Sequence, residues 1–173
     1  MKGNYDFTSV MSYANELKRI VLWILTILMV TIIFIFSSQD ATVSSNVSKS
    51  FTKQILQPIC EAISDDGVEQ ERLMEGAHFL LREGAHIFLY FALSIVLSLL
   101  LHEYAIPKWY LLCFALCFLC AIADEFNQKY FTIGRSFELI DLLKDWGGAF
   151  VGTSIIKYYM WISKKTKSAK DVR

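Results

Sequence analysis

The sequence predicts an all-α fold: an integral membrane four-helix bundle, with an amphipathic extracytoplasmic helix between spans 1 and 2. Of the 173 residues, 54% are hydrophobic, which is more than a soluble domain of this length usually carries. Four apolar runs alternate with polar segments, and ionisable residues recur at the ends of these runs. The lipid bilayer is therefore the expected partner. The formal net charge is zero, so no nucleic-acid partner is expected.

The first apolar run, residues 20–36, carries no charge and follows two basic residues. A span needs roughly 20 residues, so we expect the first one over about 18–37, after a cytoplasmic N-terminal arm of residues 1–17. No small-x-small cleavage site follows the run, which favours a retained anchor over a signal peptide. The run ends in a Ser-Ser-Gln sequence, and Gln39 closes this motif.

The segment between the first two spans is polar, with apolar residues every four positions. These are Val47, Phe51, Ile55 and Ile59. The spacing predicts an amphipathic helix over 46–63, which Pro58 is expected to bend or end. The pattern fits a helix in the plane of the lipid head groups and also a helix packed over the bundle. A second helical pattern starts near Val68 and continues into the second span.

The second span is expected over about 84–102 and carries a polar stripe. Its members lie four residues apart: Arg82, His86, Tyr90, Ser94 and Ser98. A polar stripe on an apolar helix is expected to face protein rather than lipid. His86 is either an interfacial histidine bonded to a backbone carbonyl or a member of a functional site.

The third span, about 107–124, ends in a pair of carboxylates, Asp124 and Glu125. Gln128 follows within one helical turn, so the three side chains are expected around one helical end. Charges at membrane depth are costly, and this cost favours a functional role.

The fourth span is expected over about 140–162, before a basic cytoplasmic tail of residues 163–173. Asp141, Asp145, Gly148 and Gly152 follow a 4-3-4 spacing and share one helical face. Two glycines four residues apart allow membrane helices to approach closely. This face is therefore predicted to pack against another span.

The distribution of basic residues predicts the orientation. Lysines and arginines concentrate in the tail and before the first span, and an even number of spans places both termini on one side. The positive-inside rule makes that side the cytoplasm. We therefore expect a multi-pass protein of the bacterial cell membrane, with its membrane domain over 18–162. The polar residues at the span ends then converge at the outer face of the membrane.

Five short motifs carry a family resemblance: FSSQ, REGAHxxxY, DExxQ, GR and DxxxDxxG. Together they resemble the VanZ-like family of bacterial membrane proteins over roughly residues 36–152. The founding member of that family is associated with low-level resistance to the glycopeptide teicoplanin. The resemblance implies a place in the cell envelope and a link to antibiotic resistance.

The motifs and the predicted polar layer together give the ligand-binding candidates. These are Gln39, Arg82, His86, Tyr90, Asp124, Glu125, Gln128, Arg135, Asp141 and Asp145. The chain departs from the family pattern at two positions. Ile133 stands where the family commonly has proline, and Asp145 stands where asparagine is common. Asp145 therefore brings an extra charge, and its role in this chain is open.

Two hypotheses from different classes fit these residues. In the first, the protein binds a lipid, a cell-wall precursor or a glycopeptide without turnover, and buried ion pairs hold the helices together. Arg135 would pair with Asp124 or Asp141, and Arg82 with Glu125.

In the second hypothesis, the protein is an enzyme that acts on a lipid-linked or cell-wall precursor. Four candidates would then supply general acid and base groups or hold a divalent cation: His86, Asp124, Glu125 and Asp141. The sequence contains no Ser-His-Asp spacing, metalloprotease motif or phosphate-binding loop, so no metal ligand and no cofactor is assigned.

Overall fold

The structure is a computed structural model that describes residues 7–39, 41–63, 66–133 and 137–170, apart from a few side chains within the helices. These residues form five α-helices and no strand, which confirms the all-α class. The helices are α1 (Phe7–Ser37), α2 (Ala41–Ile63), α3 (Gly67–Glu103), α4 (Trp109–Phe131) and α5 (Leu139–Lys170).

Within the described residues, three helices are long and apolar enough to cross a membrane. They are α1 from Val10 onward, α3 and α4. Helix α5 is long enough but not apolar enough to be among them, because its first turns carry charges and its end enters the basic tail. The fourth span therefore stays a prediction.

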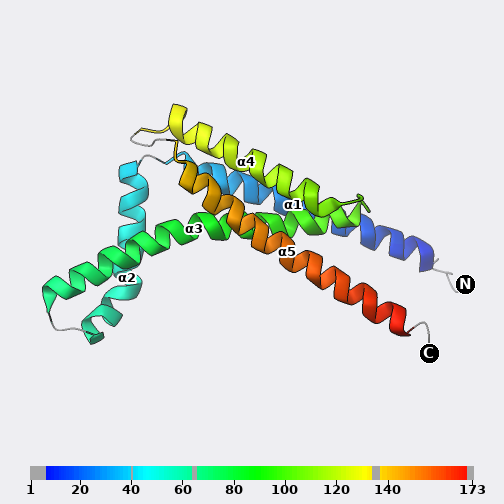
Figure 1. Cartoon of the computed structure of the whole chain (residues 1–173), viewed down its shortest axis with the longest axis horizontal. Helices are drawn as coiled ribbons and strands as arrows, with labels where there is room; N and C mark the ends of the chain where they lie inside the picture. The colour runs from blue at the N-terminus through cyan, green and yellow to red at the C-terminus, as the bar shows by residue number, and fades with distance from the viewer. Residues whose placement is uncertain (1–6, 40, 64–65, 134–136, 171–173) are drawn as a thin grey trace, which may run out of the picture.

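Helix α3 is the centre of the molecule, because it packs against each of the other four helices. Its most extensive partner is α5, which crosses α3 obliquely near its middle (Figure 1). Leu93 and Leu100 of α3 are almost fully buried, together with Ile33 of α1 and Cys117 of α4. The apolar core thus lies along the second half of α3.

The contact between α3 and α5 depends on two glycines. A Cβ atom added to Gly152 would lie 2.6 Å from the carbonyl oxygen of Phe91, and one added to Gly148 would overlap the carbonyl of Ile87. Real side chains do not approach a backbone oxygen so closely. The prediction that this glycine face packs against another helix is therefore confirmed, and the neighbour is α3.

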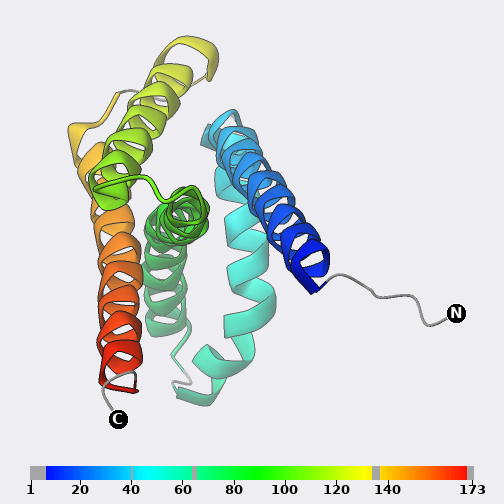
Figure 2. The same cartoon turned by 90° about the vertical axis from the view of Figure 1, so that its right-hand side faces the viewer.

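Helix α2 packs against α3, but not through its apolar stripe. Phe51, Ile55 and Ile59 are each about half exposed, whereas Thr52 and Cys60 on the neighbouring face are buried. The helix continues past Pro58, and Figure 2 shows that it changes direction along its length. Pro58 was expected either to bend the helix or to end it. The prediction that the helix ends there was wrong, because α2 continues to Ile63.

Three helices extend beyond the apolar runs that predicted them. Helix α1 begins at Phe7, inside the arm expected over 1–17, and α5 continues to Lys170, inside the expected tail. Helix α4 continues to Phe131, past the predicted end of its span. An apolar run marks only the part of a helix that is buried in a core or in lipid, and polar residues continue the helix beyond it. As a result, the DExxQ motif lies inside α4, close to the end of the helix at Phe131.

The helix ends gather at two ends of the bundle. In Figure 1 the start of α1 and the end of α5 point toward the same end of the molecule. The end of α1, the end of α4 and the start of α5 lie at the opposite end. The second group of ends carries most of the candidate residues.

Candidate functional site

A group of buried polar side chains lies where α3, α4 and α5 meet. Tyr90 of α3, Asp124 of α4 and Asp145 of α5 have no exposed surface, and Glu125 and Gln128 of α4 are almost fully buried. Burying an ionised carboxylate is expensive unless a partner compensates for the lost water. A polar group of this kind in a small protein therefore calls for an explanation beyond packing.

Each of these three helices contributes one side chain to what we call the carboxylate–histidine cluster: His86, Asp124 and Asp145. One ligand atom from each residue lies within 4.8 Å of the other two. His86 Nδ1 lies 3.8 Å from Asp145 Oδ1. The side chain of His86 is 26% exposed, while that of Asp145 is fully buried. The cluster thus has two buried carboxylates and an imidazole at its accessible edge.

Asp145 is the most unusual member of the cluster. Neither of its carboxylate oxygens accepts a hydrogen bond from any residue that the structure describes. The hydroxyl group of Tyr90 is also buried without a hydrogen bond to the described residues. Buried polar atoms are nearly always hydrogen-bonded in folded proteins, so unmatched ones indicate a functional constraint or a missing partner.

Asp124 and Glu125 are adjacent in α4 but make different contacts. Gln128 Nε2 donates to Asp124 Oδ2 over 3.3 Å, along one turn of the same helix. Glu125 Oε2 instead accepts a hydrogen bond of 3.0 Å from the backbone N–H of Glu138, directly before α5. Glu125 thereby holds the start of α5 against α4. Its contact is structural, whereas Asp124 faces the cluster.

Asp141 lies one turn before Asp145 but outside the cluster. Its carboxylate pairs with Lys144 Nζ at 2.8 Å, and Lys144 also pairs with Glu83 of α3. This ion-paired triad bridges α3 and α5 at a partly exposed position. Lys144 and Glu83 were missed from the sequence, because their pairing depends on how the two helices pack and not on local spacing.

The sequence profile of the VanZ/LLP1 family matches residues 22–162, which is most of the chain. The chain belongs to the VanZ/LLP1 family. This confirms the resemblance drawn from the short motifs. The match covers the cluster and all of the candidate residues. Comparisons with curated proteins and with solved structures give no match.

The polar stripe of this VanZ/LLP1 chain faces protein, as predicted. Tyr90, Ser94 and Ser98 are completely buried. Ser98 Oγ lies 3.3 Å from Cys113 Sγ of α4, and this sulfur lies 3.4 Å from Thr153 Oγ1 of α5. The stripe therefore continues from the cluster as a row of small polar contacts among three helices. Thr153 gave no signal in the sequence, because one threonine in an apolar run is common.

Two other family motifs are only partly described. The FSSQ motif, which ends α1, contacts α4 through a 2.9 Å hydrogen bond from Asn127 Nδ2 to Ser38 Oγ. Gln39, also in this motif, is partly buried. Arg82 lies on α3, but its side chain is outside the described part of the structure. Arg135, and with it the expected pairing of Arg135 with Asp124 or Asp141, lies outside the described residues.

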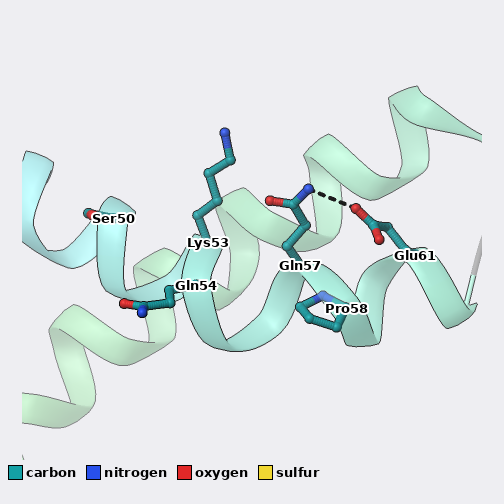
Figure 3. Close-up of a pocket in the computed structure, with 6 residues that line it drawn as sticks. All are labelled: Ser50, Lys53, Gln54, Gln57, Pro58 and Glu61. Atoms are coloured by element: carbon teal, nitrogen blue, oxygen red, sulfur yellow. Dashed lines mark hydrogen bonds between the residues drawn. The ribbon is translucent and has the colours of Figure 1, made fainter.

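Two open hollows lie away from the candidate residues of the VanZ/LLP1 chain. Figure 3 shows the first, on the surface of α2, where Gln57 Nε2 donates to Glu61 Oε1 over 2.7 Å. The second lies between α2 and α3 and includes Thr52 and His78. No member of the carboxylate–histidine cluster lines either hollow. We therefore assign the candidate site to the cluster.

Proposed function

We propose that this VanZ/LLP1 protein is a four-span integral membrane protein of the bacterial cell envelope. In this proposal the carboxylate–histidine cluster lies near the outer face of the membrane and binds the polar head group of a lipid-linked cell-wall precursor. The observation that carries the proposal is Asp145, a fully buried carboxylate whose two oxygens accept no hydrogen bond from the described residues.

The chemistry of a head group matches this site. Sugars and peptide stems of cell-wall precursors offer hydroxyl, amide and ammonium donors, and buried carboxylates are strong acceptors. Hydrogen bonds to an ionised acceptor contribute roughly twice as much as neutral ones. Such a ligand would supply the donors that Asp145 lacks, and His86 at the accessible edge gives it a way in.

A purely structural role for the cluster is less well supported. A structural ion-pair network needs a cation against each buried carboxylate. Two described basic side chains lie near Asp145. His86 Nδ1 lies 3.8 Å from Asp145 Oδ1, beyond hydrogen-bond distance, and is a cation only when its imidazole is protonated. Lys144 of α5 is already paired with Asp141 and Glu83. The charge of Lys144 is thus matched elsewhere.

The arrangement of helix ends supports the proposed topology. Helix α1 starts, and α5 ends, at one end of the bundle (Figure 1), as a chain with an even number of spans requires. The lysine-rich end of α5 then faces the cytoplasm, and the cluster lies toward the opposite side. The exposed apolar stripe of α2 suits an amphipathic helix that contacts the lipid head groups on the outside.

A second candidate function is catalysis on the same precursor. His86 is partly exposed and lies beside the buried carboxylate of Asp145, the arrangement in which a carboxylate orients a general base. His86 and Asp124 are then the acid–base candidates. A teicoplanin phenotype would follow from either function, because binding sequesters the precursor and catalysis changes it.

Lipids that copurify with the protein test the proposal. We expect mass spectrometry of the wild-type protein, extracted in native membrane discs, to detect a polyprenyl-linked precursor above its bulk membrane level. Asp145→Asn is expected to lose most of this enrichment. Glu83→Gln, which removes a carboxylate outside the cluster, is expected to keep it. Equal lipid profiles for wild type and Asp145→Asn would contradict the proposal.

Susceptibility of cells gives an independent check. Expression of the wild-type chain in a teicoplanin-sensitive bacterium is expected to raise the inhibitory concentration of teicoplanin, and expression of Asp145→Asn is expected to leave it unchanged. A phenotype that persists in Asp145→Asn would separate resistance from the cluster.

A further inference from the structure

The carboxylate–histidine cluster has the donor set of a metal site. His86, Asp124 and Asp145 come from three different helices, α3, α4 and α5, and one ligand atom from each lies within 4.8 Å of the others. Their positions in the sequence show no metal-binding spacing. Only the packing of α5 on α3 and α4 brings them together.

The electrostatics of the cluster favour a divalent ion. A metal ion binds ionised carboxylates and a neutral imidazole. In that form the three side chains carry a formal charge of −2, which one divalent cation neutralises. Both oxygens of Asp145 lack a hydrogen bond from the described residues, although the side chain is completely buried. Metal coordination is one of the few ways in which a buried carboxylate is compensated. Lys144 does not compensate it, because Asp141 and Glu83 already pair with its ammonium group.

The distances allow coordination after a small contraction. Zinc bonds to nitrogen and carboxylate oxygen are about 2.0–2.2 Å long, so two ligands in a tetrahedral site lie about 3.4 Å apart. His86 Nδ1 and Asp145 Oδ1 lie 3.8 Å apart. Rotation of the partly exposed imidazole shortens this distance. The pairs that involve Asp124 lie within 4.8 Å, so its carboxylate also has to turn toward the ion.

The mixed donor set decides the class of metal. Calcium and magnesium take oxygen ligands, whereas an imidazole with carboxylates suits borderline ions such as Zn²⁺. Three protein ligands are the number found in zinc sites that keep a position open for water or a substrate. The accessible edge at His86 is the side from which such a group reaches the metal.

We propose that His86, Asp124 and Asp145 together bind one divalent transition-metal ion of the Zn²⁺ class. The open coordination position would take a phosphate oxygen of the lipid head group, and this part of the inference rests on the proposed function. Metal binding itself does not depend on a lipid. The anionic cluster can hold a phosphate only through such a cation, because bare carboxylates repel it.

Titration with zinc alone tests the metal site. The full chain is purified in detergent, stripped with a chelator, and titrated with Zn²⁺ by calorimetry, with the bound metal counted by mass spectrometry. We expect about one Zn²⁺ per chain for the wild type, and at least tenfold weaker binding for Asp145→Asn and for His86→Gln. Glu83→Gln is expected to bind like the wild type. Substitution by Co²⁺ should give the visible absorption of a site with low coordination number.

Two variants keep the test informative if one fails to fold. His86 lies at the accessible edge of the cluster, so His86→Gln retains the core even where Asp145→Asn does not. Wild-type protein with no stoichiometric Zn²⁺, or Zn²⁺ retained by a folded His86→Gln, overturns the inference. Zn²⁺ that binds only to surface groups would bind with the same affinity to the wild type and to all three variants. This result also overturns the inference.

Failure of the metal site and failure of the head-group site are distinguishable. If the precursor copurifies with wild type but no metal binds, the proposed function stands and the metal inference falls. If zinc binds stoichiometrically but no lipid is enriched, the metal site stands and the head-group proposal falls.

Discussion

At the scale of single residues, some side chains of the family motifs form hydrogen bonds that hold helices together. Others are buried without a hydrogen bond to the residues that the structure describes. Glu125 belongs to the first kind, because its carboxylate accepts the N–H of Glu138. Asp145 and Tyr90 belong to the second kind within the described residues. The sequence identified all three as candidates but did not separate these roles, because hydrogen-bond partners far apart in the chain leave no local pattern.

Tyr90→Phe tests the second kind of residue. The change removes only a buried hydroxyl, which lies near the Cys120 thiol but makes no hydrogen bond of normal geometry to the described residues. Replacing an unsatisfied polar atom by an apolar one costs little, so we expect the melting temperature to stay the same or to rise slightly. If the hydroxyl contacts a ligand, lipid enrichment should fall in the same variant. A large loss of stability would show that the hydroxyl has a structural partner.

Glu125→Ala tests the first kind. The substitution leaves the backbone N–H of Glu138 without its acceptor at the start of α5. We expect a loss of about 1–3 kcal/mol in the free energy of unfolding. Glu138→Ala, which keeps the same N–H and the same bond, is the matched control and should be mild. Denaturation in detergent measures both, and equal losses would refute the assignment.

At the scale of elements, the pair of α3 and α5 determines where the cluster forms. The glycines at 148 and 152 let α5 approach α3 closely enough for Asp145 to reach His86. The 4-3-4 spacing predicted this face correctly, because helical periodicity is a local property. It did not predict the Lys144 bridge to Glu83, because that contact depends on the relative position of two helices.

Gly152→Leu should disrupt this contact. Even a Cβ atom at this position would lie 2.6 Å from the Phe91 carbonyl oxygen, which is fixed in α3. Overpacking of this kind costs roughly 1–3 kcal/mol or more, and we expect a clear drop in melting temperature. Val151→Leu, at a half-exposed position one step around the helix, should change stability by no more than about 0.5 kcal/mol. Similar melting curves for both variants would refute the assigned face.

At the scale of the whole molecule, the structure confirms the predicted helical class, and the family profile confirms the predicted family. Three of the four apolar runs lie in helices long and apolar enough to cross a membrane. The apolar runs did not predict the full helix lengths, because the helices continue through polar residues outside these runs. Helix α1 begins at Phe7, α4 ends at Phe131 and α5 ends at Lys170. Tyr90, Asp124 and Asp145 lie buried where α3, α4 and α5 meet, whereas Asp141 lies apart in the triad with Lys144 and Glu83. The direction of each span relative to the membrane stays a prediction.

Cysteine labelling tests the topology. In a chain whose native cysteines are replaced, Ser136→Cys is expected to react with an impermeant thiol reagent in intact cells, because the segment between α4 and α5 is proposed to face outward. Ser168→Cys, near the end of α5, is expected to react only after the cells are opened. The reverse pattern would invert the molecule in the membrane.

The central claim is that the buried carboxylate of Asp145 serves a ligand and not the fold, and thermal unfolding of Asp145→Asn tests it most directly. The wild type and the variant are compared in detergent after chelation, so that no metal contributes. Neutralising a buried, unmatched charge beside Asp124 should leave the melting temperature unchanged or raise it. A structural ion pair would instead lose roughly 3–5 kcal/mol when one partner is removed. A drop of that size in Asp145→Asn would contradict the account.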